Sequence, residues 1–202
     1  MSERVVLCYG DSNTYGSVPG GGDRFPRDVR WPGVLAARLG DGWHVVEEGL
    51  GGRTTVFDDP ILPDRNGKTY LLPCLLSHQP IDLVVVFLGT NDLKARFSAS
   101  PADIAGGVAV LTEMALAVAP KVLVLGLPRL GPLDERADEL AGAHEKAERM
   151  RPYLREYTGE LGVELLELHE LVSYTDEDGF HLDAAGHRTI GEAVAQRVVA
   201  MF

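Results

Sequence analysis

Short apolar runs alternate along this chain with longer segments whose apolar residues recur every three or four positions. Short β-branched runs are typical of buried strands, whereas the longer spacing places apolar residues on one face of a helix. The runs predict strands at residues 5–7, 44–47, 81–88, 121–125 and 163–168. The spacing predicts helices at residues 31–39, at 103–119, within 134–160, and after an N-cap at Asp183.

Two segments lack this periodicity. Residues 16–30 and 56–75 contain proline and glycine turn signals and are predicted as loops, the second with room for one helical turn. A loop as long as the second is often functional or lies at an interface. Pro152 interrupts the third predicted helix, so we expect that helix to be kinked or split there.

The alternation of strands and helices predicts an α/β fold. Parallel strands joined by right-handed helical crossovers form a sheet with helices on both faces, so we expect three α/β/α layers. The sheet is predicted to contain five parallel strands in the flavodoxin-like order 2-1-3-4-5. The length of 202 residues suits one domain covering residues 1–202, and the sequence has no internal repeat or interdomain linker.

The charge and composition of the chain argue against several classes of partner. The net charge is −11 and there is no basic patch, so nucleic acid and anionic membrane surfaces are not expected partners. No signal peptide is expected from the first residues, and no stretch reaches the roughly 18 apolar residues of a membrane-spanning helix. Cys8 and Cys74 are too few for a disulfide framework. These features favour a cytoplasmic location.

Polar or glycine-rich segments follow four of the predicted strands. The carboxyl ends of parallel strands meet at one edge of the sheet, which is where α/β folds bind ligands. The residues concerned are Ser12, Gly51, Gly52, Asn91, Asp92, Asp178 and His181. Together they supply a hydroxyl, unshielded backbone N–H groups, an amide, a carboxylate and an imidazole, which are the groups that acyl transfer requires.

Ser12 is the candidate nucleophile. A serine hydroxyl attacks poorly until a base removes its proton, and the imidazole of His181 titrates close to neutral pH. A carboxylate on the other ring nitrogen holds the imidazole in the required tautomer. Asp178 lies three residues before His181, and Gly179 between them allows a tight turn. Asp176 is the alternative orienting carboxylate.

A tetrahedral oxyanion needs donors that are fixed in advance. Gly52 has no side chain, so its N–H can approach the oxyanion closely. The N–H of Ser12 and the side-chain amide of Asn91 complete a set of three donors. One donor of this kind is typically worth about 2.7–4 kcal/mol of the barrier.

Four motifs spread over most of the chain resemble those of the SGNH hydrolases, also called the GDSL family of esterases and lipases. They are Gly-Asp-Ser at residues 10–12, Gly52, Gly-Thr-Asn-Asp at residues 89–92, and Asp178 with His181. The segments at residues 47–55 and 28–31 further resemble the bacterial arylesterase and acyltransferase branch of that family.

The resemblance implies that Ser12 is the nucleophile, His181 the base and Asp178 its orienting partner. It also implies that Ser12, Gly52 and Asn91 form the oxyanion hole. Members of the branch act on short acyl esters, so the implied partners are a small-molecule ester and water or an alcohol as acyl acceptor. No cofactor or metal is implied. A homo-oligomer is expected, because residues 56–75 are rich in apolar side chains.

The chain departs from this branch next to the nucleophile. Asn13 stands where the branch has a leucine, and Ser17 stands where it has a bulky residue. Both changes concern the width and polarity of the acyl pocket. Asn13, Lys94 and Phe180 lie beside the motifs and are the candidate substrate-binding residues.

Other functions explain fewer of these residues. An α/β-hydrolase elbow requires Gly-x-Ser-x-Gly, but Thr14 occupies the place of the second glycine. A dinucleotide-binding turn at residues 49–52 lacks the full Gly-x-Gly-x-x-Gly and the helix that should follow it. A carbohydrate O-deacetylase of the same fold, and a catalytically silent binding protein, are the alternatives that keep the predicted fold.

A metal site near the C-terminus is the remaining alternative. Asp176, Asp178, His181 and His187 lie near one another in sequence but show no recognised ligand spacing. His187 falls within the last predicted helix and is expected on its surface. The other histidines, His78 among them, are expected to have structural or solvated roles.

Overall fold

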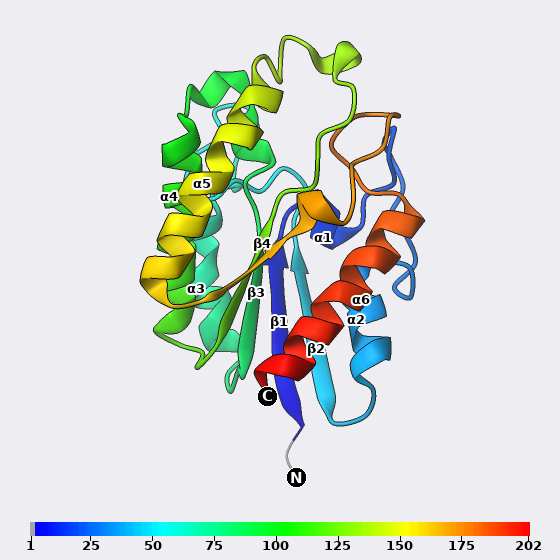
Figure 1. The fold of residues 1–202 in the computed structure, drawn as a ribbon, viewed down its shortest axis with the longest axis vertical. Coiled ribbons are helices and arrows are strands. Elements are labelled where there is room, and N and C mark those ends of the chain that lie inside the picture. Colours follow the sequence, from blue (N-terminus) through cyan, green and yellow to red (C-terminus); the bar gives the residue numbers. More distant parts are fainter. Residues whose placement is uncertain (1–2) are drawn as a thin grey trace.

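The computed structural model describes residues 3–202, and its centre is a sheet of five parallel strands (Figure 1). The strands are β1 (Arg4–Gly10), β2 (Trp43–Gly49), β3 (Leu83–Phe87), β4 (Val122–Gly126) and β5 (Glu164–Glu167). Their order in the sheet is β2-β1-β3-β4-β5. The predicted fold class and strand order are therefore confirmed.

Helices cover both faces of the sheet (Figure 1). On one face α2 (Trp31–Leu39) packs against α6 (Ala184–Met201). On the other face α4 (Pro101–Leu116) packs against both α3 (Gly67–Ser77) and α5 (Ala143–Leu161). This cover explains why every residue of β3 and β4 is buried, since a strand covered on both sides needs apolar residues at successive positions.

The helix at α3 corrects the prediction of a loop at residues 56–75. The Asn66 side chain caps this helix by accepting a hydrogen bond from the N–H of Lys68 at 3.0 Å. The helix escapes detection because apolar residues lie on its buried face and on its exposed face, as Leu71 and Leu72 show, and because Pro73 lies within it.

The sequence predicts a kink or a split at Pro152, and the helix is not split, because α5 continues through this residue. The buried side chains of Met150 and Leu154 lie on either side of Pro152 in sequence. Packing against α4 holds the helix together although one backbone hydrogen bond is lost. The predicted cap of the last helix is present, because Asp183 accepts a hydrogen bond from the N–H of Gly186 at 2.7 Å.

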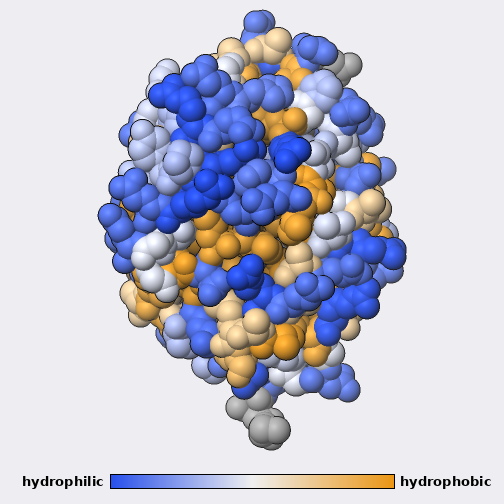
Figure 2. Space-filling view, in the orientation of Figure 1, coloured by the Kyte–Doolittle hydropathy of each residue, from blue (hydrophilic) through white to orange (hydrophobic). Residues whose placement is uncertain are grey.

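The carboxyl ends of the strands point toward the upper part of the molecule in Figure 1, where α1 (Ser12–Tyr15) follows β1. The long connections after β2, β4 and β5 also lie there. Figure 2 shows hydrophobic surface near the middle of the same face of the molecule, bordered by hydrophilic residues. Across residues 3–202, no helix combines the length and the apolar character that crossing a membrane requires.

Candidate active site

A chain of two hydrogen bonds joins three residues at the carboxyl edge of the sheet. The Oγ of Ser12 lies 2.9 Å from Nε2 of His181, and Nδ1 of the same ring lies 2.7 Å from Oδ2 of Asp178. Ser12 is at the start of α1, directly after β1, whereas the other two residues lie in the loop between β5 and α6. The fold thus brings together residues about 170 positions apart in sequence.

The carboxylate of Asp178 is fixed by backbone donors as well as by the imidazole. Its Oδ1 accepts the N–H groups of Phe180 and His181 at 3.2 and 3.0 Å, and Oδ2 accepts the N–H of Gly20 at 3.0 Å. Burial would raise the pKa of Asp178, but the imidazole and these donors outweigh it and lower the pKa to about 2. The carboxylate is therefore ionised at neutral pH. Asp176 makes no hydrogen bond to the ring among those found for residues 3–202.

Gly179 makes this compact loop possible. Its φ is +80°, and a Cβ there would lie 2.1 Å from the carbonyl oxygen of Pro132. The N–H of Gly131 also donates to the Gly179 carbonyl at 2.9 Å. Position 179 requires glycine, because any other residue disfavours the positive φ and carries a Cβ that would clash with Pro132.

The side chain of Asp11 caps α1 and so orients Ser12. Its Oδ1 accepts the N–H of Asn13 at 2.9 Å, and Oδ2 lies 3.4 Å from Nδ2 of Asn91. Burial raises the pKa of Asp11, partly offset by the Asn13 hydrogen bond. Asp11 therefore joins the nucleophile segment to the loop after β3 and makes no bond to His181 among those found.

The glycine turn after β2 is tied to the sheet. Gly52 has a φ of +80° and lines the same cavity as Ser12. The buried guanidinium of Arg53 donates to the carbonyl oxygens of Gly10, at 2.8 Å, and Glu48. The Nε of Arg65 donates to the Gly51 carbonyl at 2.7 Å. These bonds fix the position of the turn relative to the carboxyl ends of β1 and β2.

The loop after β3 presents Asn91 to the cavity. Its Nδ2 carries two N–H groups, of which one donates to the Arg53 carbonyl at 3.1 Å and the other makes the longer contact of 3.4 Å with Oδ2 of Asp11. The next residue, Asp92, is fully buried and accepts hydrogen bonds from the backbone N–H and the hydroxyl of Thr55. Burial raises the pKa of Asp92 to about 6, although the bonds from Thr55 act against this. Asp92 thus ties the Asn91 loop to the Gly52 turn.

The cavity at this site has a volume of about 250 Å³. It is lined by Ser12, Ser17, Gly51, Gly52, Leu62, Thr90, Asn91, Lys94, Arg136, Glu139, Leu140, Phe180 and His181. The predicted residues Lys94 and Phe180 are among them, and the Phe180 ring packs against that of His181 with centroids 4.3 Å apart.

Sequence reasoning predicted Lys94 but missed the other charged residues of this cavity wall, Arg136 and Glu139. Glu139 lies 3.4 Å from Nζ of Lys94, 3.2 Å from Nη1 of Arg96 and 2.9 Å from Nη1 of Arg136. Burial lowers the pKa of Lys94, although Glu139 acts to raise it. Burial would raise the pKa of Glu139, but Arg136 and Lys94 outweigh burial and lower this pKa. No sequence motif marks Arg136 or Glu139, which lie in the connection between β4 and α5.

Asn13 corrects one prediction about substrate binding. Its side chain is buried and is not among the groups that line the cavity. The amide instead donates to the Phe180 carbonyl at 3.1 Å and accepts the N–H of Leu182 at 3.2 Å. Asn13 therefore contacts the backbone of the His181 loop and not the acyl pocket.

His187 corrects a second expectation. It lies on α6 but is fully buried, and its Nδ1 accepts the N–H of Trp31 at 3.3 Å. Burial lowers the pKa of His187 to about 4. Its ring meets Phe25 edge-on, so this histidine joins α6 to α2 and to the preceding loop.

Comparison with protein families gives a match over most of the chain. Residues 8–189 match the model of the GDSL-like Lipase/Acylhydrolase family. A search of curated proteins found no match.

Many solved structures resemble this chain, including the following three. Est24, a carbohydrate acetylesterase from Sinorhizobium meliloti, is 39% identical over 99% of this chain and 100% of its own, with a TM-score of 0.96. The M. smegmatis aryl esterase is 38% identical over 98% of this chain and 100% of its own, with a TM-score of 0.95. A carbohydrate acetylesterase family member from Sinorhizobium meliloti is 33% identical over 98% of both chains, with a TM-score of 0.93.

Proposed function

Because this chain belongs to the GDSL-like Lipase/Acylhydrolase family, we propose that it hydrolyses short-chain acyl esters through Ser12, His181 and Asp178. The chain is a carboxylic ester hydrolase, and the proposal concerns its mechanism and substrates. One observation carries the proposal, namely the continuous pair of hydrogen bonds from Ser12 through His181 to Asp178.

Acylation begins when the Oγ of Ser12 attacks the ester carbonyl carbon and its proton moves to Nε2 of His181. The tetrahedral intermediate collapses, the bond to the alcohol oxygen breaks, and His181 returns the proton to that oxygen. Water then attacks the acyl-Ser12 ester by the same route and releases the acid. Asp178 remains ionised throughout, since its pKa of about 2 lies far below neutral pH, and it stabilises the imidazolium.

Three donors stabilise the oxyanion in this mechanism. We assign this role to the N–H groups of Ser12 and Gly52 and to the Asn91 N–H that makes only the 3.4 Å contact with Asp11, since all three residues line the cavity. Their positions are set before substrate arrives, because Arg53 and Asp92 hold the loops that carry them. Donors that need no reorganisation are the ones that lower the barrier most.

The cavity favours a small acyl group. Its volume of about 250 Å³ is below the roughly 300–1,000 Å³ typical of pockets for drug-sized ligands. Leu62, Leu140 and Phe180 provide apolar surface, which suits an acetyl or aryl group. The acceptor of the acyl group is water, and we also propose transfer to small alcohols.

A carbohydrate O-deacetylase is the second candidate function. The charged groups of Lys94, Arg136 and Glu139 line the same cavity and can form hydrogen bonds to the hydroxyl groups of a sugar. The likeness to Est24, a carbohydrate acetylesterase, supports this candidate, as the likeness to an aryl esterase supports the first.

The mechanism is tested by Ser12→Ala. This variant should lose turnover of p-nitrophenyl acetate while its circular dichroism spectrum stays unchanged. Ser77→Ala is the control, since this serine is exposed on α3 and should keep full activity. Undiminished activity in Ser12→Ala would rule out the mechanism.

The substrate class is tested by a panel of aryl esters and sugar acetates of increasing acyl length, with and without added alcohol. Faster turnover of sugar acetates would favour the deacetylase. Ester product formed from the added alcohol would support acyl transfer.

We also propose that the chain forms a homo-oligomer in a reducing compartment such as the cytoplasm. Ile61, Tyr70, Leu72 and Leu76 are exposed near one another in sequence, with 68% of Ile61 and 56% of Leu76 accessible. Both cysteines are free, as expected where disulfides are rare. A monomeric mass from light scattering at micromolar concentration would remove the oligomer.

A further inference from the structure

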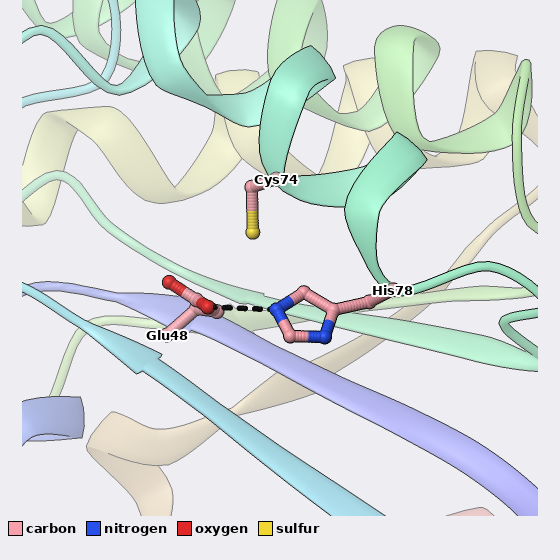
Figure 3. A group of neighbouring side chains, drawn as sticks. All are labelled: Glu48, Cys74 and His78. Atoms are coloured by element: carbon pink, nitrogen blue, oxygen red, sulfur yellow. Dashed lines mark hydrogen bonds and ion pairs between the residues drawn. The ribbon is translucent and has the colours of Figure 1, made fainter.

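Three potential metal ligands converge between β2 and α3, apart from the cavity at Ser12. Glu48 comes from β2, Cys74 from α3, and His78 from the residue that ends this helix. Figure 3 shows the thiol and the imidazole directed toward the carboxylate. One ligand atom from each residue lies within 4.8 Å of the other two, and Nε2 of His78 lies 3.0 Å from Oε1 of Glu48. None of the three lines the Ser12 cavity.

The local structure makes this grouping a fixed feature. Cys74 and His78 are four residues apart, so both project from the same side of α3. The second carboxylate oxygen of Glu48 lies 3.3 Å from the hydroxyl of Tyr70, which is one turn earlier on the same helix. The carboxylate is therefore held from two positions along α3, with Cys74 between them in sequence.

The donor set is characteristic of zinc and not of a hard cation. Thiolate, imidazole and carboxylate are the groups that bind Zn²⁺, whereas Mg²⁺ and Ca²⁺ prefer oxygen alone. Zinc bonds of about 2.0–2.3 Å in a tetrahedron place the ligand atoms roughly 3.3–3.8 Å apart. The observed limit of 4.8 Å therefore requires a contraction of about 1 Å, which small side-chain rotations supply.

The charge balance and the access route also fit. A doubly charged ion with one thiolate and one carboxylate is neutral, which limits its repulsion by nearby Arg53. Cys74 is buried and the His78 side chain is 34% exposed, so the three-residue cluster is open to solvent at His78. Glu48 also lines a surface cavity of about 550 Å³ whose wall includes Asp58, Asp64 and Arg53, so that carboxylates outnumber the one guanidinium. These acidic residues favour entry of a cation.

We propose that Glu48, Cys74 and His78 form a Zn²⁺ site, with water as the fourth ligand, that fastens α3 to the end of β2. Its role is structural, because no nucleophile or oxyanion donor of the proposed mechanism lies in it. Bound zinc would hold together two elements that border the Gly52 turn on either side in sequence. The proposed zinc site does not depend on the proposed hydrolytic mechanism, and each can be tested separately.

The test uses the full chain, freed of metal with a chelator and titrated with ZnCl₂ at neutral pH by calorimetry. The expected result is one Zn²⁺ per chain and a higher Tm in its presence, since a ligand of the folded state stabilises it. His78→Gln and Glu48→Gln should each weaken binding at least tenfold, because each removes one of three ligands. His44→Gln is the control, since this histidine is exposed and should not matter.

Cobalt identifies the thiolate directly. Co²⁺ bound to the chain should give a thiolate charge-transfer absorption that is absent in Cys74→Ser, with folding of the variant checked by circular dichroism. His78 is partly exposed, so His78→Gln decides the question if Cys74→Ser does not fold. Absence of saturable zinc binding would overturn the proposal. So would a zinc site that is lost in His181→Ala and kept in His78→Gln.

Discussion

The side-chain amide of Asn13 holds the backbone on both sides of His181. It donates to the carbonyl of the residue before this histidine at 3.1 Å and accepts the N–H of the residue after it at 3.2 Å. Asn13 directly follows Ser12, so the same side chain links the segment of the nucleophile to the loop of the base. We therefore expect the distance between Oγ of Ser12 and Nε2 of His181 to depend on this link.

Asn13→Ala should therefore lower kcat about tenfold or more, because small displacements of a base reduce the rate strongly. KM should change little, since Asn13 is buried away from the cavity wall. The free energy of unfolding should fall by about 2 kcal/mol for two lost hydrogen bonds. Ser100→Ala is the control, because it removes the cap of α4 at a residue that does not line the cavity and should lower stability without lowering kcat. An unchanged kcat in Asn13→Ala would show that the loop holds His181 without it.

Asn91→Ala should lower kcat about 100- to 1,000-fold, as expected for loss of one oxyanion donor. The effect falls on kcat because the oxyanion forms only on the way to the tetrahedral intermediate. Steady-state kinetics on p-nitrophenyl acetate measure the change. If KM rose while kcat stayed constant, Asn91 would contact the bound ester and would not stabilise the oxyanion.

Gly179→Ala should destabilise the fold by about 3 kcal/mol, because a Cβ would combine an unfavourable positive φ with a clash against Pro132. Gly162→Ala is the matched control, since its φ is +66° but no atom lies within 4 Å of the added Cβ. It should cost only about 1–2 kcal/mol. Urea unfolding of both variants separates the clash from the backbone strain. Equal costs would mean that the loop moves aside without penalty.

His187 should make stability depend on pH. Its pKa is about 4 in the folded chain against an ordinary value of 6.5, so the unfolded chain takes up the proton first as pH falls. The contribution of the neutral His187 ring to the free energy of unfolding is complete above pH 6.5. It falls by about 3 kcal/mol as the pH decreases to 4. His187→Gln lacks this term, so the stability difference between wild type and variant should shrink by that amount over the same range. The raised pKa of Asp92 makes the fold more stable as the pH falls, which is the opposite direction. This effect is the same in wild type and variant, so it cancels from their stability difference.

Urea melts at several pH values measure the His187 effect. A stability difference that stays constant from pH 7 to 4 would show that the imidazole does not resist protonation in the fold.

The sequence was sufficient for elements whose signal is local. The run around β3 is apolar at every position, and the Asp183 cap precedes a clear helical spacing, so both were predicted close to their true positions. The order of the strands was expected from the common flavodoxin-like arrangement, and the observed order agrees with it. Chemistry restricts which residue types can serve in acyl transfer, so the sequence alone points to Ser12, Asp178 and His181, which the fold brings within hydrogen-bond distance of one another.

Features that depend on tertiary packing were not visible in the sequence. Helix α3 has apolar residues on both faces, so its periodicity is lost although Asn66 caps it. Glu139 reaches the cavity from a segment without a motif, and only the folded chain shows its three cationic neighbours. Asn13 was assigned to the pocket because sequence adjacency to Ser12 says nothing about which way a side chain points.

Arg53 fixes the Gly52 turn to the ends of β1 and β2, whereas Arg136, Glu139 and Leu140 reach the cavity from the connection between β4 and α5. The turn that carries the proposed oxyanion donor Gly52 therefore belongs to a different part of the chain from the cavity-wall residues 136, 139 and 140. This separation defines a target for directed evolution. A library that randomises residues 136, 139 and 140 can alter substrate preference while the Ser12–His181 distance stays under the control of other residues.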